Sequence, residues 1–393
     1  MKKTLIGYYF LSVMVLGAVS CSSDDDNSNP TDQSVAEKSA VIENYANLVF
    51  KNYQDAYDGA KAMQTAINTF VATPTQVNFD AAKAAWKTAR ETYGQTEAFR
   101  FASGPIDDND GPEGVLNAWP LDENYVDYVS GNANSGIIND PTTHPTINKA
   151  ALEVLNEDGG EKNISVGYHA IEFLLWGQDN SLPSAKEAGQ RPFTDFVDGG
   201  TASNQSRRRD YLAVCADLLL DHLQLLLDEW KVNGTYRSTF LALEADVALK
   251  NMLTGISTLA KSELAGERVF VAYDNQNQED EHSCFSDNTH RDLRLNLAGV
   301  ANVFRGSYTT INGSSLEDLI TKKNATLGAE ITAQLAAAES AVNATATPFD
   351  FAISDAAERP KVIAAVNALR ALGDKFVEGG NVLGITVSSD LPE

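Results

Sequence analysis

Residues 35–71, VAEKSAVIENYANLVFKNYQDAYDGAKAMQTAINTFV, decide the fold class of this chain. Their apolar side chains recur every three or four residues, the spacing that places side chains on one face of a helix. The side chains that follow this spacing are Val41, Tyr45, Leu48, Val49, Ala56, Ala60, Met63 and Ile67. The pattern predicts one long amphipathic helix that is broken at Pro74 and Asn78.

The same helical pattern recurs through the rest of the chain. Helices are expected over residues 79–100, 147–155, 166–176, 210–230, 236–264, 293–304, 315–344 and 359–377. The alternation of apolar and polar residues that is typical of strands is not convincing anywhere in the sequence. We therefore predict an all-α fold of two helical bundles packed together, with a cleft at their junction. Residues 35–200 would form the N-terminal bundle, including helix 166–176, and residues 201–393 the C-terminal bundle.

Residues 102–145 interrupt the helices with an irregular connection that contains Gly104-Pro105, Gly111-Pro112 and Trp119-Pro120. Connections of this length are uncommon inside a compact domain and are often functional.

The N-terminus has the features of an export signal. Lys2 and Lys3 precede a mostly apolar stretch, residues 5–19, which is short for a membrane span. Ala18-Val19-Ser20-Cys21 follows, and the small residue before the cysteine suits lipoprotein processing. We expect residues 1–20 to be a signal peptide and Cys21 to carry lipid. The alternative is an ordinary signal peptide with a chance cysteine.

Residues 21–34 are polar and acidic, so we expect a flexible tether after the lipidated cysteine. Their acidic run resembles the surface-export signal of Bacteroidetes lipoproteins. This resemblance implies an outer-membrane anchor that faces outward, to the cell surface. A lipoprotein that faces the periplasm is the alternative.

The charge of the chain excludes some partners. With 54 acidic and 30 basic residues, its formal net charge is −24 at pH 7. Such a surface repels phosphates, so nucleic acid is not an expected partner. Once Cys21 carries lipid, only Cys215 and Cys284 could form a disulfide. We expect none, because Cys215 lies in an apolar helical run.

The segment Gly167-Tyr168-His169-Ala170-Ile171-Glu172 carries the sharpest chemical signal. His169 and Glu172 are three residues apart, so on a helix they project from one face. An imidazole nitrogen and a carboxylate placed in this way could bind one cation. The alternative is a hydrogen bond between the two side chains in a helical core, which occurs often by chance.

Gly167, His169 and Glu172 match the GxHxxE motif of the imelysin-like proteins, also called the imelysin peptidase family. Three further regions resemble that family in the same order: residues 93–107, 119–122 and 266–292. The resemblance spans about residues 41–377, and it is strongest to the iron-regulated imelysin-like lipoproteins of gut Bacteroidetes. It implies two helical bundles with a cleft, and a role in bacterial iron uptake or in peptide hydrolysis.

The matching regions also imply a site. Candidate metal ligands by their place in these regions are His169, Glu172, Glu97 and His290. Candidate cleft or supporting residues are Gly167, Arg100, Asp107 and Asp287. Structural alternatives are that Arg100 pairs with Glu97 or Asp107, and that Asp287 caps the next helix. Glu279-Asp280-Glu281-His282 lies in a polar loop, and we interpret it as surface.

Three functions fit these residues. The first is a monomeric binding protein for a metal ion, iron or zinc, or for an iron-containing ligand, working with an outer-membrane uptake partner. Haem, with His169 as an axial ligand, is one such ligand. The second is a metallopeptidase that uses His169 and Glu172 as metal ligands; it would need a third ligand and a general base from elsewhere. The third is a non-catalytic interaction protein whose polar cleft is structural.

Overall fold

The computed structural model describes residues 30–108 and 111–391. The expected signal, residues 1–20, and the expected lipid-bearing Cys21 lie outside the described residues. The first elements are α1 (Pro30–Ala72), α2 (Gln76–Tyr93), η1 (Gly94–Phe99), α3 (Glu113–Leu116), α4 (Glu123–Val126), η2 (Ile137–Asn139), α5 (Lys149–Leu155), α6 (Gly167–Trp176), η3 (Pro183–Ala185), η4 (Phe193–Phe196), α7 (Gln205–Trp230) and α8 (Thr235–Leu241). The remaining elements are α9 (Ala245–Thr258), η5 (Leu259–Phe270), α10 (Val271–Asn275), η6 (Gln278–Asp280), α11 (Thr289–Arg305), β1 (Ser307–Tyr308), β2 (Ile311–Asn312), α12 (Leu316–Lys323), α13 (Ala325–Asn343), α14 (Phe349–Ser354) and α15 (Arg359–Val382).

The all-α prediction is confirmed. In the described part of the chain, the one sheet is the short antiparallel hairpin of β1 and β2. No described helix is both long enough and apolar enough to cross a membrane. Cys215 and Cys284 are buried and free, as expected.

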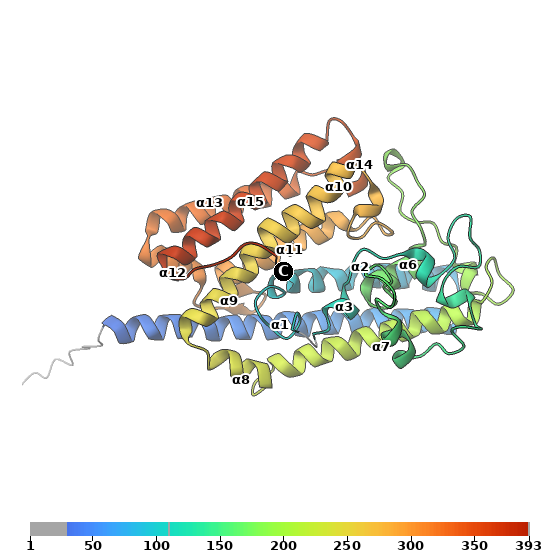
Figure 1. Ribbon diagram of the computed structural model, residues 1–393, viewed down its shortest axis with the longest axis horizontal. Coiled ribbons are helices and arrows are strands. Elements are labelled where there is room, and N and C mark those ends of the chain that lie inside the picture. Colours follow the sequence, from blue (N-terminus) through green and yellow to red (C-terminus); the bar gives the residue numbers. More distant parts are fainter. Residues whose placement is uncertain (1–29, 109–110, 392–393) are drawn as a thin grey trace, which may run out of the picture.

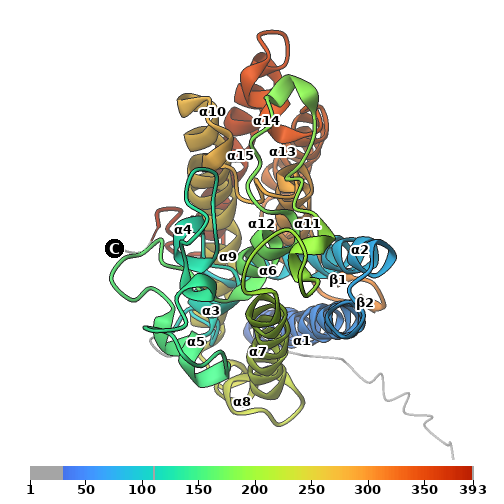
Figure 2. The ribbon, with the colours of Figure 1, turned by 90° about the vertical axis from the view of Figure 1, so that its right-hand side faces the viewer.

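The helices form two layers (Figure 1). The lower layer holds α1, α2, α7 and α8, and the upper layer holds α12, α13, α14 and α15. Helices α9 and α11 contact both layers, because α9 packs against α1 and α15 while α11 packs against α2 and α13. Figure 2 places α6 between α7 below and α11 above. The helix with the GxHxxE segment therefore lies where the layers meet.

Helix α1 forms the spine of the lower layer because its predicted apolar face is buried against α2 and α7. It begins at Pro30, inside the segment 21–34 that we expected to be a tether. Proline is well suited to the first turn of a helix. The polar composition of residues 21–34 did not indicate this helix start. The expected division at residue 200 stays a prediction; α7, which follows it, packs against α1 and α6.

The irregular connection is held in place by a buried charge. Asp127 accepts hydrogen bonds from Arg208 Nε at 2.7 Å and Arg208 Nη2 at 2.8 Å, and it pairs with Arg191. All three side chains are nearly inaccessible to solvent. A buried carboxylate needs such partners, because leaving it uncompensated is costly. This ion pair ties the connection to α7 and fixes one wall around α6.

Candidate functional site

Helix α6 begins in a backbone conformation that requires glycine. Gly167 has φ +88°, and a Cβ atom there would lie 2.8 Å from the carbonyl oxygen of Leu116. A side chain would be both strained and in collision, so glycine lets α6 start directly against α3. All ten residues of α6 are buried. Gly167 therefore supports the site by placing α6.

His169 and Glu172 face each other on α6, as their spacing predicts. His169 Nδ1 lies 2.9 Å from Glu172 Oε2. Glu172 Oε1 accepts hydrogen bonds from the backbone N–H of Ser286 at 2.9 Å and from its hydroxyl at 2.6 Å. Both carboxylate oxygens of Glu172 are thus occupied. His169 Nε2 is buried and has no hydrogen-bond partner among the described residues.

The environment keeps His169 neutral. Burial lowers the pKa of His169 well below its ordinary value, and the positive charge of Arg90 lowers it further. Burial also raises the pKa of Glu172 to about 8, although its hydrogen bonds from Ser286 act in the opposite direction. A proton on His169 Nδ1 leaves a lone pair on Nε2, which is the form that binds a metal.

A second histidine lies beside the first. The rings of His169 and His282 have centroids 4.7 Å apart and are nearly perpendicular. His282 Nδ1 lies 2.9 Å from Asp292 Oδ2, and Asp292 also pairs with the buried Arg90 at 3.0 Å. Burial lowers the pKa of His282 to about 3, so this ring is neutral as well. Its Nε2 faces the amide of Asn117 at 3.5 Å.

Placing residues 279–282 at the surface was wrong for Glu281 and His282, which are only 1% and 4% exposed. The loop after η6 turns inward there, and Ser283, Cys284 and Phe285 are buried with it. Cys284 and Phe285 could have indicated this burial in the sequence, because two apolar residues directly after a polar run indicate that the chain enters a core.

Glu97 is held in an ion pair with an arginine side chain. Its Oε2 pairs with Arg268, and its Oε1 lies 3.3 Å from the amide nitrogen of Asn117. Burial alone would raise the pKa of Glu97, but Arg268, with Arg100, lowers it to about 2. Arg100 pairs with Glu97 at 3.8 Å and with Asp107 at 3.5 Å. The expected clamp between helix and loop is therefore present.

His290 lies in the first turn of α11, and Asp287 lies in the loop just before that helix. His290 Nδ1 is 3.0 Å from the carbonyl oxygen of Asp287, not beside His169. The residue that caps α11 is Asn288, and no side-chain cap bond forms, so Asp287 does not cap this helix. Glu97, His169, Glu172 and His290 do not form one compact ligand set: in the described chain, the one such set of three or more is Asp179, Asp287 and Asp350.

A cavity of about 590 Å³ adjoins this centre, with His282, Asn117 and Trp119 in its wall. The Trp119 ring also packs on His169, with centroids 5.1 Å apart. The acidic residues that line the cavity are Glu113, Glu157, Glu161, Glu263, Glu267 and Asp280. The basic ones are Arg100, Lys162 and Arg268. Glu157, Glu161 and Lys162 are exposed, so the cavity reaches the surface with an excess of negative charge.

Fold and site together define an all-α protein whose two helical layers enclose a pair of neutral histidines, each held by a carboxylate. The chain belongs to the Imelysin family, whose model matches residues 49–376. It is 26% identical over 338 residues to iron-regulated protein A of Synechococcus elongatus, covering 83% of this chain and 81% of that protein. The family resemblance is therefore confirmed.

A solved structure supports the fold. The crystal structure of a protein named as an iron-regulated protein A precursor, from Parabacteroides distasonis, matches with a TM-score of 0.69. The two proteins are 20% identical, and the match covers 91% of this chain and 97% of that one.

Proposed function

We propose that this protein serves iron acquisition by binding a metal ion or an iron-containing ligand at the paired histidines His169 and His282. The observation that carries the proposal is the unpartnered Nε2 of His169, buried beside the second imidazole. In metal sites, a ligating histidine commonly holds a carboxylate on its other ring nitrogen. Glu172 and Asp292 occupy this position on His169 and His282.

The chemistry of the site agrees with iron or zinc. Imidazole nitrogen is a good ligand for both metals. The acidic lining of the cavity would raise the local concentration of cations before they reach His282. Two relatives are named for regulation by iron, which favours iron over zinc. Haem would use the same imidazoles, and it is distinguished by its absorption spectrum.

Binding is favoured over peptide hydrolysis because of how Glu172 is held. A catalytic zinc site uses three protein ligands, a water molecule and a general base. Both oxygens of Glu172 are already engaged: Oε2 lies 2.9 Å from His169 Nδ1, and Oε1 accepts two hydrogen bonds from Ser286. We assign Glu172 to orienting His169 rather than to ligating a metal or activating water.

The proposal includes an anchor at the outer membrane through lipid on Cys21, with an uptake protein in the same membrane as the partner. The polar segment after Cys21 supports a tethered binding protein that hands its ligand on. Replacing Cys21 with alanine should move the protein from the membrane fraction to the soluble fraction. An unchanged membrane fraction for the Cys21→Ala variant would refute the anchor.

The binding proposal is tested by titrating purified protein separately with Fe²⁺ without oxygen, with Zn²⁺ and with haem. We expect one of these to bind at micromolar concentration or tighter, and His169→Ala to abolish that binding. The same preparations are assayed for cleavage of a peptide mixture with and without a chelator. Chelator-sensitive cleavage that His169→Ala removes would replace the proposal with the metallopeptidase. Absence of binding in all three titrations would leave the polar cleft with a structural role.

A further inference from the structure

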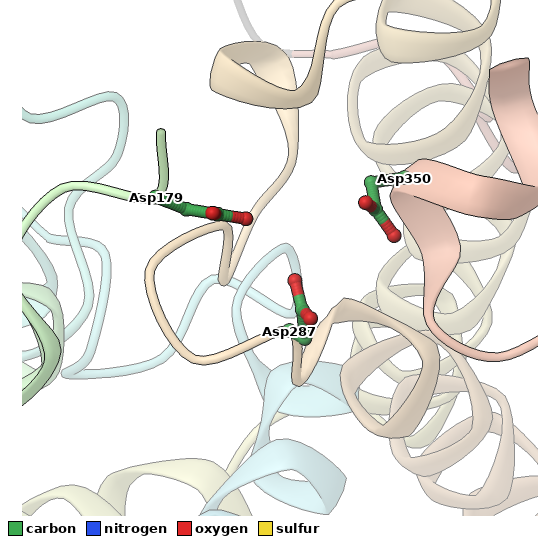
Figure 3. Close-up of side chains that lie close together, drawn as sticks. All are labelled: Asp179, Asp287 and Asp350. Carbon is green, nitrogen blue, oxygen red and sulfur yellow. The ribbon is translucent and has the colours of Figure 1, made fainter. Parts of the chain in front are cut away.

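Three aspartates from distant parts of the sequence converge on one point (Figure 3). Asp179 follows α6, Asp287 precedes α11, and Asp350 lies in the first turn of α14. One carboxylate oxygen from each lies within 4.8 Å of the other two. Figure 3 shows the three carboxylates directed toward a shared space. None of these aspartates belongs to the paired histidines described above.

The negative charge of this cluster is not balanced by ion pairs. Among the described residues, no lysine, arginine or histidine pairs with Asp179, Asp287 or Asp350 within 4.0 Å. Lys87 and Lys186 are the cations that act on the cluster from farther away. Lys186 itself is placed over the ring of Phe351, with its Nζ 3.7 Å from the ring centre.

Two buried carboxylates have oxygens without partners here, which is independent evidence that this space suits a cation. Asp350 is 1% exposed; its Oδ1 accepts from the backbone N–H of Phe351, but its Oδ2 is buried without a partner. Glu281 is also 1% exposed, and both of its oxygens are buried without a hydrogen-bond partner among the described residues. Unpaired buried carboxylates are costly unless a cation or a proton compensates them.

The protonation behaviour agrees with this picture. Burial raises the pKa of Asp287 to about 7 and that of Asp350 to about 6, and neighbouring carboxylates add to both shifts. The acids repel one another when they are ionised together.

The ligand chemistry identifies the class of cation. The three ligands are carboxylate oxygens, which suit hard cations and not the softer metals that prefer thiolate. Mg²⁺ is usually held by one or two carboxylates and keeps several waters, whereas Ca²⁺ accepts several carboxylates in a flexible geometry. Three carboxylate oxygens that lie within 4.8 Å of one another therefore suit Ca²⁺ better.

We propose that Asp179, Asp287 and Asp350 form a calcium site that clamps the end of α6 to the loop before α11 and to α14. Asp287 directly follows Ser286, which holds Glu172 through two hydrogen bonds. Calcium at this position would therefore stabilise the loop that carries both His282 and Ser286.

The test compares wild-type protein with the Asp179→Asn/Asp350→Asn variant, after chelation and then in about 1 mM Ca²⁺. In Ca²⁺ the wild type should bind one ion per chain, measured by calorimetry, and its melting temperature should rise by about 2 °C or more. The variant should lose at least about tenfold in affinity, because calcium affinity depends on the charge of its ligands.

The melting temperature of the variant, compared with that of the wild type, should depend on whether Ca²⁺ is present. Without Ca²⁺, the variant removes charge repulsion, so it should melt at or above the wild-type temperature. With Ca²⁺, it should melt below the wild type. A purely structural role for these aspartates would instead lower the melting temperature in both conditions.

Asp58→Asn, at an exposed position of α1, serves as the matched control and should behave as wild type. His169→Ala should bind Ca²⁺ normally, so the calcium site and the paired histidines are tested separately. Equal calcium responses of wild type and Asp179→Asn/Asp350→Asn, or no calcium response in the wild type, would overturn the proposal.

Discussion

At the scale of single residues, Glu172 sets the chemical state of the paired histidines. A metal bound at His169 Nε2 requires the proton on Nδ1, where the ionised form of Glu172 accepts it. Glu172 thus acts on the metal through His169 and not by ligating it. In this role the negative charge of the Glu172 carboxylate matters, and not only the space that its side chain fills.

Replacing Glu172 with glutamine tests this role. The amide retains the shape of the carboxylate, but its N–H₂ can donate to His169 Nδ1 and so move the ring proton to Nε2. We expect metal affinity to fall about 10- to 100-fold, as when the second partner of a ligating histidine is lost. Calorimetric titration measures the change.

The matched control for Glu172→Gln is Glu153→Gln, because Glu153 pairs with His222 away from this centre, at 3.1 Å. The control should bind metal as the wild type does. Wild-type affinity in Glu172→Gln would show that the carboxylate does not orient the ligand.

A second residue gives the stability a pH dependence. Burial raises the pKa of Glu113 to about 7, outweighing its ion pair with Arg100 at 3.4 Å. A raised carboxyl pKa means that folding favours the protonated form. The stability that protonation contributes is complete below the unfolded pKa and is lost as the pH rises through about 7.

The Glu113→Gln variant should not show this loss of folding stability at higher pH, because glutamine does not titrate. Between about pH 5 and pH 8, the free energy of unfolding of the variant should improve relative to the wild type by about 1–3 kcal/mol. Urea unfolding at both pH values measures it, with the exposed Glu161→Gln of the same cavity as control. Parallel pH profiles for Glu113→Gln and wild type would contradict the assignment.

The sequence predicted some residues of this centre and missed others for a physical reason. His169 and Glu172 could be paired because a helix fixes which residues share a face. Ser286, His282 and Asp292 come from more than a hundred residues away, and no local period indicates where a loop returns to the core. The predicted ligand roles of Glu97 and His290 stay predictions, although Glu97 is held by Arg268.

At the scale of secondary structure, α6 depends on how it begins. The left-handed backbone of Gly167 and its close approach to Leu116 set the position of His169 two residues later. Long amphipathic helices such as α1 were predictable from their period. The π-helical segment η5 (Leu259–Phe270) was not, because its wider turn has no distinct apolar period, and such segments are frequent at functional sites.

Gly167→Ala should therefore destabilise the protein by at least about 2 kcal/mol, through strain at positive φ and the contact with Leu116. Thermal or urea unfolding measures the loss. Gly266→Ala is the matched control: a Cβ atom there would meet nothing within 4 Å, and its φ is not positive, so its stability should change little. Equal stabilities of the two variants would show that the start of α6 is not constrained.

At the scale of the whole molecule, the buried polar centre is assembled from segments that lie far apart in the sequence. Helix α6, where the layers meet, supplies His169 and Glu172, while the loop after η6 supplies His282 and α11 supplies Asp292. The all-α prediction is confirmed, whereas the division at residue 200 stays a prediction; α7, which follows that division, packs on α1 and α6. Amphipathic period identifies a buried face but not the helix that covers it.

The most direct test of the central claim is elemental analysis of protein purified without a histidine tag from iron-replete cells. The wild type should carry iron or zinc near one equivalent per chain, and the His169→Ala/His282→Ala variant should carry almost none. His290→Ala, which leaves both members of the pair intact, should retain the wild-type content. Equal metal content in the wild type and His169→Ala/His282→Ala would contradict the claim that the paired histidines bind the ligand.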